Sequence, residues 1–237
     1  MEQEAQPGRG RRDLLWKEAT NTACHVFNTK AGPLVLQDHC PAVLVELLRA
    51  ESGLHAFMRL PEREYQLILA LAKRPDTKLT LAYTLGREIV GQVTLTPATG
   101  WWQDPGCTYE ISLEVSSSWR RLGIARQLVA NALQDKVVEE LIILGLGLHW
   151  HWDTERLGLP PFRYRALLAR AAAVYGFSEY FTSEPNISDD PANILLARLG
   201  RGVSQKRINQ FVERLLHSDT LLGLSSSGWI EQEHEAC

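Results

Sequence analysis

Two segments rich in apolar and β-branched side chains, residues 79–84 and 89–96, stand four residues apart and constrain the fold more than any other feature of the chain. The connection, residues 85–88, reads Leu-Gly-Arg-Glu and is a turn sequence. Strands joined by so short a connection pair in antiparallel fashion, whereas parallel strands need a crossover of about a dozen residues or more. The pattern therefore predicts a β-hairpin and argues against a doubly wound, parallel nucleotide-binding fold.

The spacing of apolar side chains predicts the remaining elements. Helices are predicted at 41–50, from Pro61 until Pro75 ends the helix, after Gly123, at 162–175 and after Ser204, and strands at 109–115, 141–146, 177–181 and 194–199. The strand at 141–146 is nearly all apolar and is therefore expected to lie in the middle of the sheet. Strands and helices mixed in this order predict an α/β fold.

Composition and charge exclude several classes of protein. The 237 residues are 45% apolar and 22% charged, which is normal for a globular protein. The polar ends predict flexible tails at 1–20 and 219–237, with one domain at 21–218 between them. The net charge of −3 argues against a dedicated nucleic-acid binder. No apolar run approaches the roughly 20 residues of a membrane span, and no signal segment is visible, so a cytoplasmic protein without membrane contact is expected.

The most informative segment is a predicted strand followed by a short loop and a helix, with the pattern Arg120-x-x-Gly123-x-Ala125. Glycine lets the backbone approach a ligand closely and turn into a helix. The first N–H groups of a helix have no partner within it and attract anions, and Arg121 and Arg126 add to the positive charge of Arg120. The pattern therefore favours a site for a diphosphate.

Two carboxylates, Glu110 and Glu114, lie on the strand that leads into this site. They share one face of a regular strand, because successive side chains point to opposite faces. A carboxylate there could take a proton from an amine nucleophile if burial raises its pKa toward neutrality. The other interpretation is that both are exposed charges at an edge of the sheet.

The segment resembles the GNAT superfamily of acetyl-CoA-dependent N-acetyltransferases, whose signature is Arg or Gln, two residues, Gly, one residue, then Gly or Ala, between a strand and a helix. The resemblance implies acetyl-CoA as co-substrate and a largely antiparallel central sheet with helices on both faces. It also implies that the loop and helix start bind the diphosphate, while the strand pairs through its backbone with the pantetheine arm. The coenzyme-binding residues that it implies are Leu113, Val115, Arg120, Arg121, Leu122, Gly123, Ile124, Ala125 and Arg126.

The same resemblance ranks the candidate catalytic groups. Glu114 lies beside the backbone that would hold pantetheine, whereas Glu110 lies nearer to where an amine would wait, so Glu110 is the preferred general base and Glu114 the second choice. Many members carry a tyrosine four residues before the glycine of the last helix, which protonates the leaving thiolate. That position is Ala172 here, and Tyr175 is displaced along the helix. The general acid is therefore open between solvent and other groups, with Tyr164 a weak candidate.

A narrower resemblance rests on separated motifs that agree in order. Trp-His-Trp-Asp at 150–153 and Pro-Ala-Asn at 191–193 follow the coenzyme motif as they do in the acetoin utilisation branch of the GNAT proteins. Gly-Leu-His-Ala-Phe at 53–57 also matches, and the similarity covers about residues 32–217. That branch is associated with acetylation of acetyl-CoA synthetase. The resemblance therefore implies a protein lysine as acceptor and acetyl-CoA synthetase as a partner.

The closely spaced His149 and His151 could suggest a metal site. No third ligand stands at a recognisable spacing and the four cysteines form no Cys-x-x-Cys pair, so no metal is expected. His151 and Asp153 stay open between a structural network, in which one of them bonds the backbone near the site, and a catalytic or substrate-orienting role.

Three functions stay open for the whole chain: a protein lysine acetyltransferase, a small-molecule amine acetyltransferase, and a non-catalytic module that senses acetyl-CoA. Glu110 and Glu114 favour the two enzymes, and the missing tyrosine keeps the third in consideration. The oligomeric state is not predicted.

Overall fold

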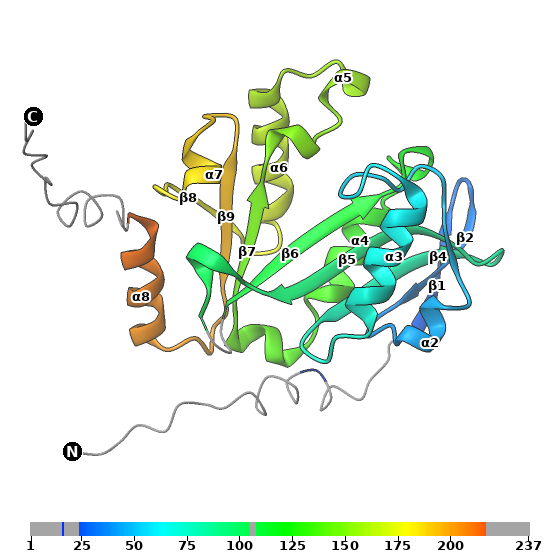
Figure 1. The fold of residues 1–237 in the computed structure, drawn as a ribbon, viewed down its shortest axis with the longest axis horizontal. Coiled ribbons are helices and arrows are strands. Elements are labelled where there is room, and N and C mark those ends of the chain that lie inside the picture. Colours follow the sequence, from blue (N-terminus) through cyan, green and yellow to red (C-terminus); the bar gives the residue numbers. More distant parts are fainter. Residues whose placement is uncertain (1–15, 17–23, 105–107, 217–237) are drawn as a thin grey trace, which may run out of the picture.

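The computed structural model describes residue 16 and residues 24–104 and 108–216. Its centre is a nine-stranded sheet in the order β1-β2-β4-β5-β6-β7-β9-β8, with β3 paired to β5 (Figure 1). The strands are β1 Cys24–Thr29, β2 Gly32–Gln37, β3 Arg49–Ala50, β4 Lys78–Thr84, β5 Glu88–Pro97, β6 Thr108–Val115, β7 Ile142–Gly147, β8 Ser178–Tyr180 and β9 Ile194–Leu199. Within the described residues, β3 with β5 and β6 with β7 are parallel, and the other pairs are antiparallel. The predicted mixed α/β fold with a largely antiparallel sheet is confirmed.

Helices cover both faces of this sheet, as expected. They are α2 Ala42–Val45, α3 Pro61–Ala72, α4 Ile124–Ala132, α5 Thr154–Leu157, α6 Pro161–Ala173, α7 Pro185–Ser188 and α8 Gln205–Leu215. Ile68 of α3 packs in one buried cluster with Leu79 and Leu81 of β4. Leu128 of α4 packs in another with Ala82, the next residue of β4. Because side chains alternate along a strand, the two helices lie on opposite faces.

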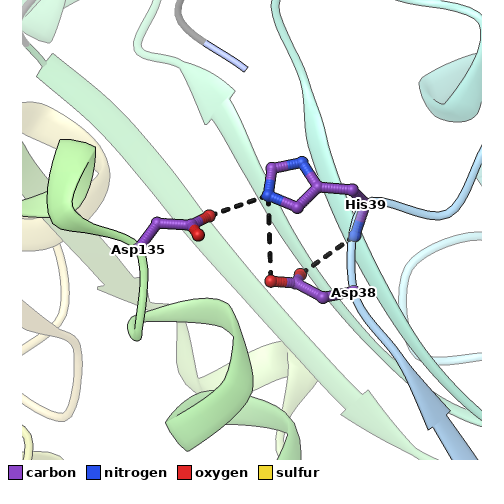
Figure 2. Close-up of side chains that lie close together, drawn as sticks. All are labelled: Asp38, His39 and Asp135. Carbon is purple, nitrogen blue, oxygen red and sulfur yellow. Dashed lines mark hydrogen bonds and ion pairs between the residues drawn. The ribbon is translucent and has the colours of Figure 1, made fainter. Parts of the chain in front are cut away.

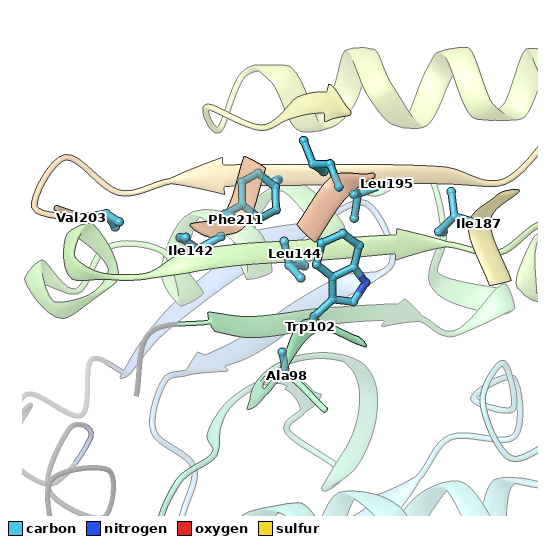
Figure 3. Packing of buried hydrophobic residues seen from close by; sticks show 10 residues of the cluster. Ala98, Trp102, Ile142, Leu144, Ile187, Leu195, Val203 and Phe211 are labelled. Atoms are coloured by element: carbon cyan, nitrogen blue, oxygen red, sulfur yellow. The ribbon is translucent and has the colours of Figure 1, made fainter. Parts of the chain in front are cut away.

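The C-terminal helix α8 packs on the part of the sheet formed by β7 and β9. Phe211 of α8 lies in a buried cluster with Leu144 of β7 and Leu195 of β9 (Figure 3). Trp102 comes from the segment before β6 and packs against Phe211, with ring centroids 5.9 Å apart. The burial of these side chains holds α8 against the sheet, since aromatic residues remove much apolar surface from water.

Two local features differ from the sequence-based expectation. The predicted helix at 41–50 is helical only over Ala42–Val45, because the chain then turns so that Arg49 and Ala50 pair in parallel with β5. The hairpin of β1 and β2 was not predicted. In β1 exposed and half-buried side chains mix, so this strand lacks the strong apolar alternation that reveals a half-buried strand.

Trp16 lies in the segment expected to be a flexible tail, yet it is buried, with 6% of its surface exposed. Its ring meets Tyr109 of β6 edge to face at 5.6 Å. The other residues of 1–20, and all of 219–237, lie outside the described residues. The expectation of two flexible tails therefore stays a prediction for those residues.

Candidate active site

The two parallel strands in the middle of the sheet separate part-way along their length. The ladder between β6 and β7 joins Thr108–Glu110 to Ile142–Leu144. Beyond it β6 continues through Ile111–Val115 and β7 through Gly145–Gly147, and Figure 1 shows the strands diverging there. We call these two stretches the β6–β7 fork. The backbone of Leu113 and Val115, predicted to pair with pantetheine, lies on the β6 arm of the fork.

The loop after β6 ends in a tight turn at the start of α4. Gly123 caps the helix with φ of +79°, and Arg121 before it has φ of +64°. A β-branched residue is strongly disfavoured at such an angle, so glycine suits this turn. Ile124 is buried in the core and fixes the first turn of α4 in place. The N–H groups at the start of α4 thus face the end of the loop, where an anion would bind.

Arg120, predicted to meet the diphosphate, makes contacts within the protein. Its Nη1 forms an ion pair with Asp153, and its Nε donates to the carbonyl oxygen of Val115 over 3.1 Å. Of the other predicted residues, Leu122 and Ala125 pack partly against the α4 core. The carbonyl oxygen of Arg126 accepts from the hydroxyl of Tyr175 over 2.9 Å. The predicted loop residues are therefore brought together, with Arg120 tied to β6.

Glu114 is buried on the face of β6 that α3 covers, with 4% of its surface exposed. Its Oε1 accepts the N–H groups of both His55 and Ala56, each over 2.8 Å. Burial raises the pKa of this carboxyl, and the nearby Glu64 raises it further, against the lowering effect of those hydrogen bonds. Glu114 is therefore not an exposed edge charge, and it shapes the chain at 55–56.

Glu64 in the first turn of α3 is a second buried carboxylate, which the sequence did not single out as a site residue. Its Oε2 accepts the N–H groups of Phe57 and Met58, over 3.3 and 3.0 Å. The Nε2 of Gln92 donates to Glu64 over 2.8 Å and to Glu114 over 3.4 Å. The signal that could have found it is its spacing: Glu64 stands four residues before the buried Ile68, on the same stripe of the helix.

Glu110 lies at the base of the fork and is half-buried. Its Oε1 accepts one long hydrogen bond, 3.4 Å from the N–H of Thr99. Burial raises the pKa of Glu110, and the charge of Glu184 adds to the increase, while the Thr99 N–H lowers it. The ladder between β5 and β6 runs without a register shift from Tyr109 to Val115, so Glu110 and Glu114 share one face as predicted. Glu110 is thus a partly desolvated carboxylate whose oxygens can accept further hydrogen bonds or a proton.

The segment after β7 carries the Trp-His-Trp-Asp motif and contacts three separate parts of the protein. The N–H of His149 donates to Oδ1 of Asn193 over 2.8 Å. The Nδ1 of His151 lies 3.1 Å from the carbonyl oxygen of Ala56. Asp153 forms the ion pair with Arg120. His151 and Asp153 therefore take part in a hydrogen-bond network, which was one of the two roles left open for them.

The tyrosines near the fork occupy different environments. Tyr164 of α6 is half-buried and stacks on Trp152, with ring centroids 5.0 Å apart, and burial raises the pKa of its hydroxyl. Burial also raises the pKa of Tyr175, whose hydroxyl donates to Arg126. Ala172 of α6, at the position where the superfamily has tyrosine, is half-buried and packs against the core. Since both hydroxyls stay protonated well above neutral pH, each has a proton to donate.

A separate cluster of charged groups joins the start of β4 to the segments that follow β2 and α4. One ligand-type atom each from Asp38, His39 and Asp135 lies within 4.8 Å of the others (Figure 2). The buried Lys78 supplies positive charge there, because its Nζ is 2.8 Å from Asp38 Oδ2 and pairs also with Asp135. The ring of Trp16 lies 5.6 Å from the same ammonium. We therefore interpret this cluster as a buried ion network that joins three elements.

In the described part of the chain, every helix is too short or too polar to cross a lipid bilayer.

Comparison with known proteins agrees with this geometry. Residues 43–145 match the Acetyltransferase (GNAT) family. The acetoin utilization protein AcuA of Bacillus subtilis is 29% identical over 160 residues, which cover 65% of this chain and 75% of that protein. AcuA of Bacillus licheniformis is 27% identical over 165 residues, covering 68% and 78%. The crystal structure of an acetoin utilization protein from Exiguobacterium sibiricum superposes with a TM-score of 0.79 at 24% identity, covering 85% of this chain and 97% of that one.

The fork, the glycine-capped helix and these similarities point in the same direction. Residues 43–145 are similar to the GNAT acetyltransferases, and about two thirds of the chain is similar to the acetoin utilization proteins AcuA, which supports an N-acetyltransferase.

Proposed function

We propose that this protein transfers an acetyl group from acetyl-CoA to a lysine side chain of another protein, with acetyl-CoA synthetase as the first candidate. The observation that carries the proposal is the β6–β7 fork, whose β6 arm leads directly into the turn at Gly123 and α4. The similarity to AcuA supports a role linked to acetoin or acetate metabolism.

The fork would bind the pantetheine arm of the coenzyme, and the turn before α4 would bind its diphosphate. The backbone of Leu113–Val115 offers ladder groups to the amides of the pantetheine arm, because β6 has no strand partner on that side among the described residues. The N-terminus of α4 offers N–H groups to the diphosphate, and Arg121 and Arg126 add positive charge. The acetyl thioester supplies the carbonyl carbon that the amine attacks.

Glu110 fits the role of general base. An acceptor lysine enters as an ammonium and must lose a proton before its nitrogen can attack. Burial raises the pKa of Glu110 toward that of a useful base, and the one hydrogen bond that it accepts from the described residues is long, which leaves oxygen lone pairs to accept the proton. The carbon–sulfur bond then breaks, and the departing thiolate takes a proton from a hydroxyl such as that of Tyr164 or Tyr175, or from solvent.

The coenzyme part of the proposal is tested by calorimetry with acetyl-CoA and CoA on Gly123→Val. The variant forces a β-branched side chain into a positive φ and displaces the N–H groups at the helix start, so the affinity should fall at least about tenfold. Gly176→Val is the matched control, because Gly176 has φ of +82° at the far end of α6. It should lose similar stability and keep its affinity. Wild-type affinity in Gly123→Val, or an equal loss of affinity in both variants, contradicts the assignment.

The acceptor part is tested by incubation with acetyl-CoA and purified acetyl-CoA synthetase, followed by mass spectrometry of its lysines. We expect an added acetyl group on a specific lysine. A parallel panel of free amines, including polyamines and amino acids, should turn over poorly. The opposite result would assign the protein to the small-molecule acetyltransferases, and binding of acetyl-CoA without any transfer would assign it a sensing role.

A further inference from the structure

The segment Leu148–Asp153 follows β7 at the open end of the fork and leads into α5 (Figure 1). Its alternate members His149, His151 and Asp153 each bond a different part of the protein. The motif that it carries is not used by the proposed chemistry. We call this segment the bridge.

The contact at Asp153 ties the bridge to the coenzyme side. Arg120 is held from two directions, by Asp153 and by the carbonyl oxygen of Val115 at the end of β6. About a quarter of each side chain of the ion pair is exposed, so solvent screens it less than a pair on the open surface. The bridge is thereby fixed to the loop that precedes α4.

The contact at His151 ties the bridge to residues 55–58, which Glu114 holds on the same face of β6 as the candidate base Glu110. A carbonyl oxygen can only accept, so Nδ1 of His151 carries the proton and donates to Ala56. The same residue, Ala56, gives its N–H to the buried Glu114. The ring of Phe57 lies 5.9 Å from the ring of His151. The backbone at Ala56 is therefore held at its N–H by the carboxylate of Glu114 and at its carbonyl oxygen by His151 of the bridge.

We propose that the bridge couples the coenzyme loop to the segment His55–Met58, with Asp153 and His151 as positioning residues for the acceptor. The proposal rests on the proposed acetyl transfer. In this role His151 needs only to donate a hydrogen bond from the position of Nδ1 to Ala56. It does not gain or lose a proton during the reaction. Small displacements of a reacting group lower the reaction rate strongly. A bridge of this kind therefore affects turnover without touching the substrate.

The first test separates positioning from acid–base chemistry at His151. The amide nitrogen of asparagine can occupy the place of Nδ1 and donate to Ala56, whereas leucine cannot. We expect His151→Asn to keep kcat/KM for the acceptor within about threefold of the wild type, and His151→Leu to lose about tenfold. Equal and large losses in both variants would overturn the proposal and make the imidazole itself catalytic.

The second test concerns the ion pair. Asp153→Asn should lower kcat/KM for the acceptor about tenfold and leave the Kd of acetyl-CoA within about twofold, while Asp153→Glu restores most of the rate. In an Arg120→Gln background, Asp153→Asn should have little further effect, because the partner is already gone. Additive losses in this cycle, or a loss confined to acetyl-CoA affinity, would contradict the coupling.

A matched control is Glu139→Gln, which weakens the ion pair of Glu139 with Arg198 beside β9, outside the bridge. It should keep wild-type kinetics, and melting temperatures of all variants identify any that are unfolded. The two proposals fail differently. A wild-type protein that neither binds acetyl-CoA nor acetylates any acceptor contradicts the proposed function. An active wild type whose bridge variants keep the wild-type kcat/KM contradicts only this inference.

Discussion

The two carboxylates of β6 share one face of one strand and yet are bonded very differently. Glu114 is almost fully buried, and one of its oxygens accepts two backbone N–H groups over 2.8 Å each. Glu110 is half-buried and accepts one N–H over 3.4 Å. Burial raises the pKa of both. A buried carboxylate with short backbone bonds organises a loop, whereas a desolvated one with unused lone pairs can do chemistry.

The largest effect expected from this comparison is on turnover in Glu110→Gln. Glutamine keeps the shape and cannot accept the ammonium proton, so kcat should fall by about 10²–10⁴-fold while the Kd of acetyl-CoA stays nearly constant. Steady-state kinetics and calorimetry measure the two quantities. The control is Glu179→Gln on β8, which neutralises a carboxylate outside the fork.

The comparison breaks if Glu110→Gln keeps the wild-type kcat at neutral pH while Glu114→Gln loses it, because the roles are then reversed. Full rate in both variants would exclude a carboxylate base on this strand.

The next effect is on stability at Glu114. Glu114→Ala removes the acceptor of the His55 and Ala56 N–H groups, two charge-assisted hydrogen bonds in a partly buried position, so we expect a loss of about 2–5 kcal/mol in the free energy of unfolding. Glu114→Gln keeps an oxygen for both groups and should lose clearly less, with kcat within about tenfold of the wild type. Urea denaturation of the pair measures the difference. Equal stability of both variants would show that the hydrogen bonds to 55–56 contribute little.

The smallest effect is a pH dependence that follows from the raised pKa of Glu110. Because the pKa of Glu110 is raised, its proton-accepting form is lost as pH falls through a value above the ordinary glutamate range, and kcat/KM should show that limb. The folded state then binds this proton more tightly than the unfolded state. The stability that the raised pKa contributes is present at low pH and lost as pH rises through the window between the two values.

Glu110→Gln should therefore gain stability relative to the wild type as pH rises through that window. Urea denaturation at a series of pH values measures the gain, and a difference between the two proteins that does not vary with pH would contradict it.

Local patterns predicted much of this molecule, and long-range pairing explains what they missed. The alternation at 109–115 placed Glu110 and Glu114 on one face, and the glycine turn at 123 was predicted from its neighbours alone. The buried role of Glu64 depends on Gln92 and on a loop that the α3 sequence does not specify. The pairing of Arg120 with Asp153 spans 33 positions in the chain, and no spacing rule predicts such a partner.

The short ladder between β6 and β7 divides the sheet into two leaves, with β1 to β6 in one and β7 to β9 in the other. A ligand that forms hydrogen bonds to both arms of the fork would connect these two parts of the sheet. At about a hundredfold excess over its Kd, such a ligand adds about 2.7 kcal/mol to the stability of the folded state. Amide hydrogen exchange would then slow most along 111–115 and 145–147, and little in the already continuous pair of β4 and β5. If the coenzyme binds as proposed and also contacts β7, it would be a structural member of the sheet as well as a reactant.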